Sequence, residues 1–333
     1  MIHKFSAIHR FLTLVLLLAL VVAIAGCAPS SDTSSDQASE GNGNTLRVGL
    51  KPTDSDAQIL FAEELGYFEE AGLTVEPEQI SGGAAIASGV ASGSLDIGSA
   101  NVTSVASAYD EDLHFVNIAP GSMYNNSGPI SQALMVAKDS PIRSAEDLNG
   151  GTVAVNGLNN ITDIAVKGWA DENGGDSNTL EFVEFPFPEM PGAVEQGRVD
   201  AAMMLEPGLT QALQTCCEVL GLGYDGIADE FMTSGWITTK EWAEQNPEMV
   251  DEFAEVMRKT ALWANDEQNH ERSAEILQQY LDIDSETANT MQRAVFGETL
   301  DPAMIQPQID AAAKYGVIEE RFDATEIIAT SQR

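Results

Sequence analysis

The sequence contains Gly93-Ser94-Leu95-Asp96-Ile97-Gly98, and 104 residues later it contains the similar stretch Gly197-Arg198-Val199-Asp200-Ala201-Ala202. A segment of mostly small residues with helical spacing precedes each copy, at 82–92 and at 190–196. This pattern predicts a helix, a glycine turn, a buried strand and a polar loop at the strand's carboxyl end, where open α/β sheets bind ligands. Two copies predict two similar lobes that face one cleft, unless a common helix-to-strand turn is repeated by chance.

Strand and helix patterns alternate around both copies. Apolar runs predict strands at 46–50, 73–75, 115–118, 132–137, 152–155, 180–185 and 235–239, with helical spacing between most of them. This order favours an α/β fold with mainly parallel sheets. After the last of these strands the patterns are helical, at 247–262, 274–281, 286–295 and 303–314.

The first 44 residues predict an export signal and a tether. Residues 1–26 combine the basic Lys4 and Arg10 with an apolar run too short to span a bilayer comfortably. The run closes with Ile24-Ala25-Gly26-Cys27, which resembles a bacterial lipobox and implies cleavage before Cys27 and lipidation of that residue. The alternative is an ordinary signal with an incidental cysteine. Residues 27–44 are polar and predict a flexible tether.

The mature chain is strongly acidic. Loss of Lys4 and Arg10 leaves 14 basic residues against 52 acidic ones, a net charge of −38. Such a charge disfavours nucleic acid and anionic lipid surfaces as partners. The acidic residues are scattered and predict solvated faces. About 290 residues follow the tether, enough for two domains with cores of their own.

Several short stretches, in order and spacing, resemble the solute-binding proteins of ABC importers for nitrate, sulfonates, taurine and thiamine precursors. They are Leu46-Arg47-Val48-Gly49-Leu50, the run 64–73, the stretch 93–98, Ser140-Pro141-Ile142, the run 146–150, and 197–207. The resemblance implies a two-lobed, type II periplasmic-binding-protein-like fold with two crossover strands, near 130–137 and 232–239. Lobe one would comprise 45–137 and 234–333, with the C-terminal helices packed on it, and lobe two 138–233.

The resemblance also implies a function. The protein would be an extracytoplasmic monomer without cofactor or catalytic activity, anchored by lipid to the outer face of the cytoplasmic membrane. It would capture a small molecule between the lobes and deliver it to a permease with its ATPase. A sensory surface lipoprotein is a further alternative, which neighbouring genes would distinguish.

The candidate ligand-binding residues lie in the loops at the carboxyl ends of the predicted strands and beside the presumed hinge. They are Pro52, Thr53, Asp54, Gly82, Gly83, Asn101, Thr103, Ser104, Tyr124, Asn156, Asn160, Thr162, Glu206 and Trp236. Lys51 is the sole base in these loops, and its side chain can point away. We therefore expect helix N-termini at Gly83 and Thr162, with hydroxyl and amide groups, to hold a small anion.

Glu206 points to a different ligand. A carboxylate in the cleft suits a hydrogen-bond-donating ligand, such as an aminopyrimidine thiamine precursor or the amino group of taurine, although Glu206 can also be only a hinge residue. Our first expectation is a small organic anion of the sulfonate, taurine or nitrate class, and the alternative is a pyrimidine or similar heterocycle.

Cys216 and Cys217 are the only cysteines after Cys27. Because a disulfide between neighbours closes a strained ring, we expect two free thiols, with a vicinal disulfide as the alternative. A metal site is not expected, since none of the four histidines lies near a cysteine in sequence. Pyrimidine synthases of the thiamine pathway share the implied fold and carry a cysteine-rich motif. The lysine and histidine that those enzymes need have no evident match here.

Overall fold

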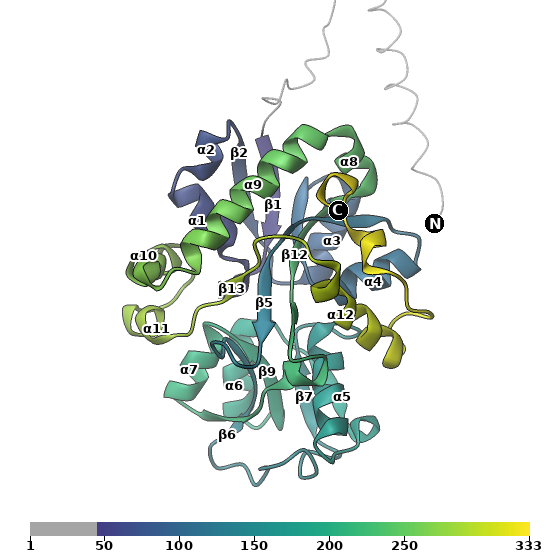
Figure 1. Cartoon of the computed structure of the whole chain (residues 1–333). Helices are drawn as coiled ribbons and strands as arrows, with labels where there is room; N and C mark the ends of the chain where they lie inside the picture. Colours follow the sequence, from purple (N-terminus) through teal and green to yellow (C-terminus); the bar gives the residue numbers. More distant parts are fainter. Residues whose placement is uncertain (1–44) are drawn as a thin grey trace, which may run out of the picture. The chain divides into compact units, whose positions relative to one another are not determined.

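The structure is a computed structural model that describes residues 45–333. The predicted signal, Cys27 and the tether lie outside the described residues. Two five-stranded sheets form the two lobes of the described part, and a three-stranded sheet lies between them (Figure 1). None of the helices in 45–333 is both long and apolar enough to cross a bilayer.

Lobe one is built on the sheet β2-β1-β3-β12-β4. Its strands are β1 (Thr45–Leu50), β2 (Thr74–Gln79), β3 (Ile97–Ala100), β4 (Phe115–Pro120) and β12 (Gly235–Thr239). Its helices are α1 (Gln58–Glu64), α2 (Tyr67–Glu70), α3 (Gly83–Ser92), α4 (Val102–Asp110), α8 (Lys240–Gln245), α9 (Pro247–Ala264), α10 (His270–Tyr280), α11 (Ser285–Thr290) and α12 (Pro302–Lys314).

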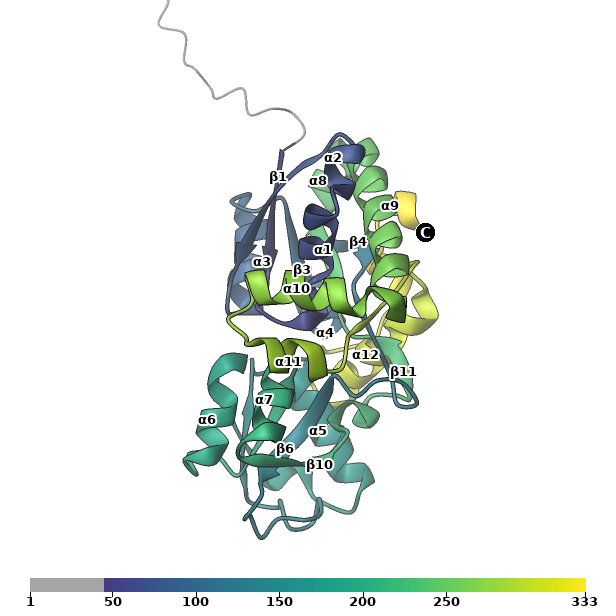
Figure 2. The ribbon, with the colours of Figure 1, turned by 90° about the vertical axis from the view of Figure 1, so that its left-hand side faces the viewer.

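Helices cover both faces of the first sheet, because alternate strand residues point to opposite faces. On one face Leu46, Val48 and Leu50 of β1 pack into a core that α1, α9 and α10 share. On the other face α3, α4 and α12 contribute a second core, which includes Ile237 of β12. Figure 2 shows α3 on one side of the sheet and α9 on the other. The C-terminal helices therefore pack on lobe one, as expected.

Lobe two repeats this topology in the sheet β8-β7-β9-β6-β10. Its strands are β6 (Gln132–Ala137), β7 (Thr152–Val155), β8 (Glu181–Glu184), β9 (Ala201–Leu205) and β10 (Cys217–Gly221), with helices α5 (Ile161–Glu172), α6 (Met190–Glu195) and α7 (Gly208–Gln214). In each sheet three parallel strands are followed by one strand that runs antiparallel to both its neighbours: β12 in lobe one and β6 in lobe two.

The two copies of the repeated stretch occupy equivalent places in the two lobes. Gly93 follows α3 and Gly197 follows α6, and both adopt a positive φ that glycine tolerates without steric cost. Each glycine turn leads into a strand that pairs in parallel with an earlier strand of its lobe: β3 with β1, and β9 with β7. The predicted lobe duplication is therefore confirmed by topology.

The lobes are joined through a small sheet of β11 (Glu230–Met232), β5 (Ser122–Asn125) and β13 (Val295–Phe296). The chain leaves lobe one after β5 and enters β6, and it returns through β11 into β12. The strands β6 and β12 are the two expected crossover strands. The prediction assigns 132–137 to lobe one, but β6 belongs to lobe two, because it pairs with β9 and β10.

One predicted helix is shorter than its pattern. We expected a helix over 286–295, but α11 ends at Thr290 and the chain then becomes extended, with Met291 at ψ 148°. The Arg293 guanidinium donates back to the carbonyl oxygens of Ala288 and Met291. This tertiary arrangement replaces helical hydrogen bonds, and the next residues form β13.

Candidate functional site

A cavity lies between the lobes, where the carboxyl ends of β1 and β3 face those of β7 and β9. Its volume is about 30 Å³, room for roughly one water molecule. A larger ligand therefore needs the lobes or the lining side chains to move apart. The lining residues are Lys51, Ser55, Asp56, Asn101, Ser122, Asn156, Ile161, Thr162, Phe187, Leu205, Tyr224, Thr233 and Ser234.

The charged part of the cavity is a buried pair at the end of β1. The Lys51 ammonium lies 2.7 Å from Asp56 Oδ2 and donates to Ser99 Oγ at 2.7 Å. The backbone N–H of Lys51 donates to the same Asp56 oxygen. Lys51 is 8% exposed and Asp56 1%. The lysine that sequence reasoning left aside is thus turned into the cleft by partners on η1 (Asp54–Asp56) and β3.

The remaining polar groups of the cavity are neutral. Ser122 Oγ lies 2.6 Å from Thr233 Oγ1 and 2.9 Å from Ser234 Oγ. Three hydroxyl groups are therefore adjacent at the point where the chain crosses between the lobes. In lobe two, Thr162 donates to Asn156 Oδ1 at 2.8 Å in the first turn of α5. The amino end of α5 therefore faces the cavity and favours negative charge there.

Three candidate residues join the two lobes directly. Asn160 Nδ2 donates to Ser104 Oγ at 3.0 Å, and Asn101 Nδ2 donates to Asn160 Oδ1 at 3.2 Å. Asn101 also caps α4 through the Ser104 N–H, and Asn160 forms a capping box with Asp163 at the start of α5. Helix caps thus serve as contacts across the cleft.

A second inter-lobe contact involves buried carboxyl groups. The Asp54 N–H donates to the carbonyl oxygen of Glu206 at 3.2 Å, and Asp54 Oδ2 accepts the Ala294 N–H. The Glu206 carboxyl accepts the Thr210 N–H and hydroxyl. Burial raises the pKa of Asp54 to about 6 and that of Glu206 to about 7, and the nearby Arg293 offsets part of the rise for Asp54.

Glu206 faces a neighbouring groove and not the cavity itself. This groove has a volume of about 390 Å³ and is lined from both lobes, by residues that include Pro52, Thr53 and Glu206. Phe187 and Leu205 line both the groove and the cavity. The two spaces are therefore adjacent parts of one cleft.

Besides Asp54, Ser104 and Asn160, five candidates line neither the cavity nor the groove. Gly82 and Gly83 start α3 and are half-buried. Thr103 donates to Gln308 and Tyr124 donates to Asp225, each within packed core. Trp236 donates to Gln58 Oε1 and is buried in the core of lobe one, so it is not available to stack on a ligand.

Cys216 and Cys217 form a vicinal disulfide. Our expectation of free thiols is therefore wrong. The pair lies at the junction of α7 and β10, where the backbone is neither continuous helix nor strand, so the two sulfur atoms can meet. Neither cysteine lines the cavity. Among residues 45–333 no group of three or more His, Cys, Asp or Glu side chains could hold a metal ion.

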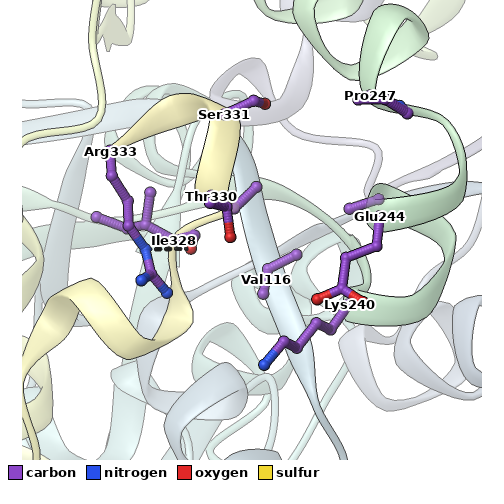
Figure 3. Close-up of a pocket in the computed structure, with 10 residues that line it drawn as sticks. Val116, Lys240, Glu244, Pro247, Ile328, Thr330, Ser331 and Arg333 are labelled. Carbon is purple, nitrogen blue, oxygen red and sulfur yellow. Dashed lines mark hydrogen bonds between the residues drawn. The ribbon is translucent and has the colours of Figure 1, made fainter.

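Another pocket, of about 260 Å³, lies at the other end of lobe one (Figure 3). Lys240 and Glu244 of α8 form one side and the C-terminal residues Thr330 and Arg333 the other. It lies beside the first half of β4, away from the carboxyl ends of the parallel strands. We prefer the cleft as the functional site, because both lobes contribute converging polar groups there.

Comparison with known proteins agrees with this architecture. The chain is 28% identical over 216 residues to the taurine-binding periplasmic protein of Escherichia coli strain K12. That match covers 63% of each chain, so it spans less than two thirds of the E. coli protein.

Solved structures show the same fold. The periplasmic aliphatic sulphonate binding protein SsuA of Escherichia coli matches with a TM-score of 0.69 at 17% identity, over 86% of this chain and 92% of that one. The periplasmic nitrate-binding protein NrtA of Synechocystis PCC 6803 matches with a TM-score of 0.72 at 13% identity, over 86% of each chain. The expected two-lobed fold of type II periplasmic binding proteins is confirmed. The profile of the family described as "NMT1/THI5 like" matches residues 55–271, more than half of the chain, and the protein therefore belongs to that family.

Proposed function

We propose that this protein is the solute-binding component of an ABC importer, which captures a small organic anion in the inter-lobe cleft and delivers it to a permease. The observation that carries the proposal is Lys51, a buried ammonium that lines the cavity. Hydroxyl groups and the amino end of α5 supplement it. The ammonium keeps one N–H donor beyond its bonds to Asp56 and Ser99, and an acidic ligand group can accept from that donor.

The connection between the lobes supports capture by closure. The covalent links are short crossing segments, which include β5 and β11 of the small sheet, so the lobes can rotate about them once the few direct hydrogen bonds between the lobes open. Ligand that contacts both lobes stabilises the closed arrangement over the open one. The permease would then recognise the closed form.

A second candidate ligand is a pyrimidine thiamine precursor. The aromatic residues Phe187 and Tyr224 line the cavity beside the carboxylate of Asp56, an arrangement that suits a flat, donor-bearing ring. We rank it second, because a neutral ring offers no counter-charge to Lys51. A synthase-like enzyme is ranked last, because the cysteines lie in a disulfide outside the cavity.

We further propose that the protein is a monomer anchored by lipid on Cys27 at the outer face of the cytoplasmic membrane. The support is the lipobox-like stretch that ends at Cys27. Two or more acyl chains on one residue hold a protein at a membrane far better than a single chain. Cys27→Ala should move the protein to the soluble fraction; an unchanged membrane fraction would refute the anchor.

The ligand class is tested by thermal unfolding with taurine, alkanesulfonates, nitrate and aminopyrimidines. A ligand at a hundred times its Kd stabilises the protein by about 2.7 kcal/mol, which is a measurable shift in Tm. The proposal expects shifts with sulfonates. A shift with aminopyrimidines alone would establish the second candidate, and no shift with any of these compounds would remove both ligand classes.

A further inference from the structure

The Lys51–Asp56 pair, which lines the cavity, is incompletely hydrogen-bonded. An ammonium has three N–H donors. Lys51 donates one to Asp56 Oδ2 and one to Ser99 Oγ, so the third N–H has no partner in these two contacts. Asp56 Oδ1 is buried and has no hydrogen-bond partner among the described residues. The pair therefore has one donor and one acceptor to spare, and both of its residues line the cavity.

Such an atom calls for an explanation, because buried polar atoms in native proteins almost always have partners. Within residues 45–333, two other buried side-chain oxygens also have no hydrogen-bond partner, one on Asp54 and one on Asn117. Asp54 lies near Arg293, and Asn117 donates to Ile327 beneath the C-terminal segment. Of the three residues only Asp56 lines the cavity.

Charge decides what kind of ligand can complete the pair. Lys51 and Asp56 neutralise each other, so a simple anion would bring an uncompensated charge into a buried site. A zwitterion adds no net charge. Its acidic group can accept from Lys51, and its ammonium can donate to Asp56 Oδ1.

We propose that Asp56 recognises a ligand amino group, so that this site selects amino-sulfonates over sulfonates without an amine. The inference rests on the proposed function and deepens it, because it names the ligand class and the residue that selects it. An aminopyrimidine also offers a donor to Asp56 but gives Lys51 no negative charge, and it is therefore an outcome of the test.

The test compares two ligands that differ in one group, taurine and propane-1-sulfonate, by isothermal titration calorimetry on the purified protein. The methyl group of the second replaces the ammonium of the first and cannot donate to Asp56. Because a site built for a hydrogen bond rejects an analogue that lacks it, wild type should prefer taurine by about a hundredfold. In Asp56→Asn the preference should fall to about threefold or less, through weaker taurine binding.

Asp96→Asn is the matched control. Like Asp56, Asp96 pairs with a basic residue and accepts that residue's backbone N–H, but its partner is Arg47 of β1 and Asp96 does not line the cavity. The Asp96→Asn variant should prefer taurine over propane-1-sulfonate to the same degree as wild type. If Asp56→Asn does not fold, N-trimethylated taurine on wild type serves instead, because it keeps the positive charge and loses the donors. Its affinity should be about a hundredfold weaker than that of taurine.

The outcomes separate the two proposals. Equal binding of taurine and propane-1-sulfonate by wild type would overturn the role of Asp56 and leave the proposed function standing. A preference that survives in Asp56→Asn would assign amine recognition to another group. Binding of aminopyrimidines without any sulfonate would overturn both proposals.

Discussion

The two lobes use the repeated aspartate in the same way. In lobe one, the Asp96 N–H donates to the Arg47 carbonyl oxygen at 2.9 Å and the Arg47 N–H donates to Asp96 Oδ2 at 2.8 Å. In lobe two, Asp200 and Thr152 exchange the same two bonds at 2.9 and 2.8 Å. Each aspartate thus links its glycine turn to the neighbouring parallel strand, β1 in lobe one and β7 in lobe two.

The lobes differ at the opposite ends of those strands. Strand β1 leads to Lys51, a buried cation paired with Asp56, whereas β7 leads to Asn156, a neutral amide bound to Thr162. The repeated aspartates therefore hold each sheet together, and we call their contacts the frame. The positions at which the two copies differ, Lys51 and Asn156, face the cleft. Ligand chemistry depends on the difference between the lobes.

The largest effect should come from removing this difference. Lys51→Met should weaken ligand binding by about a hundredfold, or ~2.8 kcal/mol, because it deletes a charge-assisted bond and leaves Asp56 without its counter-ion. Asn156→Ala removes only a neutral group and should cost about tenfold. Calorimetry measures both, with Lys167→Met, another lysine paired with a buried aspartate, as the control outside the cavity. Equal losses for Lys51 and Asn156 would contradict an asymmetric cleft.

The contact between the lobes should make stability depend on pH. Asp54 and Glu206 have folded pKa values of about 6 and about 7, above those of the unfolded chain. Between about pH 4 and about pH 7 the folded state thus binds more protons, and the free energy of unfolding falls as pH rises.

Urea unfolding across that range measures this dependence. The free energy of unfolding of wild type should fall further across this range than that of the double variant Asp54→Asn/Glu206→Gln, since amides at these positions do not titrate. The comparison with the double variant removes the contribution of the other carboxylates. Parallel pH profiles for the two proteins would show that the pair does not titrate in this range.

The repeated aspartates should affect stability and not binding. Asp96→Ala should lower the free energy of unfolding by about 2 kcal/mol, because it also loses two bonds to the Arg47 guanidinium. Asp200→Ala should cost about 1 kcal/mol, since its bonds are more exposed. Ligand affinity should stay within about twofold of wild type in both. A large loss of affinity in either variant would mean that the frame and the site are not separable.

The smallest effect is expected at the contact between Asn160 and α4. Ser104→Ala removes one neutral hydrogen bond between the lobes, which should favour the open form by about 0.5–1 kcal/mol. Small-angle scattering of the ligand-free protein should then report a larger radius of gyration. Ser107→Ala, one turn further along α4, is the control and should leave the radius unchanged.

Fold class was predictable from sequence because it depends on local patterns. Alternating apolar residues, helical spacing and glycine turns act over a few residues, so the strand order and the duplication could be inferred from them. The lobe to which residues 132–137 belong could not be predicted in this way. An apolar run indicates a strand, but pairing with β9 and β10 depends on partners far along the chain.

Site residues were predictable only in part. Loop position marked Asn101, Asn156 and Thr162 as candidates, and these three line the cavity. Position in sequence could not show that Trp236 points into the core of lobe one, toward Gln58, 178 residues away.

The two-lobed α/β fold, the family and the side of each sheet on which ligand is expected could be inferred without the structure, because they follow from patterns repeated along the chain. That Lys51 lies at the cleft could be seen only in the folded protein. Its partners are Asp56 and Ser99, and Ser99 comes from another strand, 48 residues on. The direction of a long, flexible side chain depends on the partners that folding brings to it, and no local pattern encodes them.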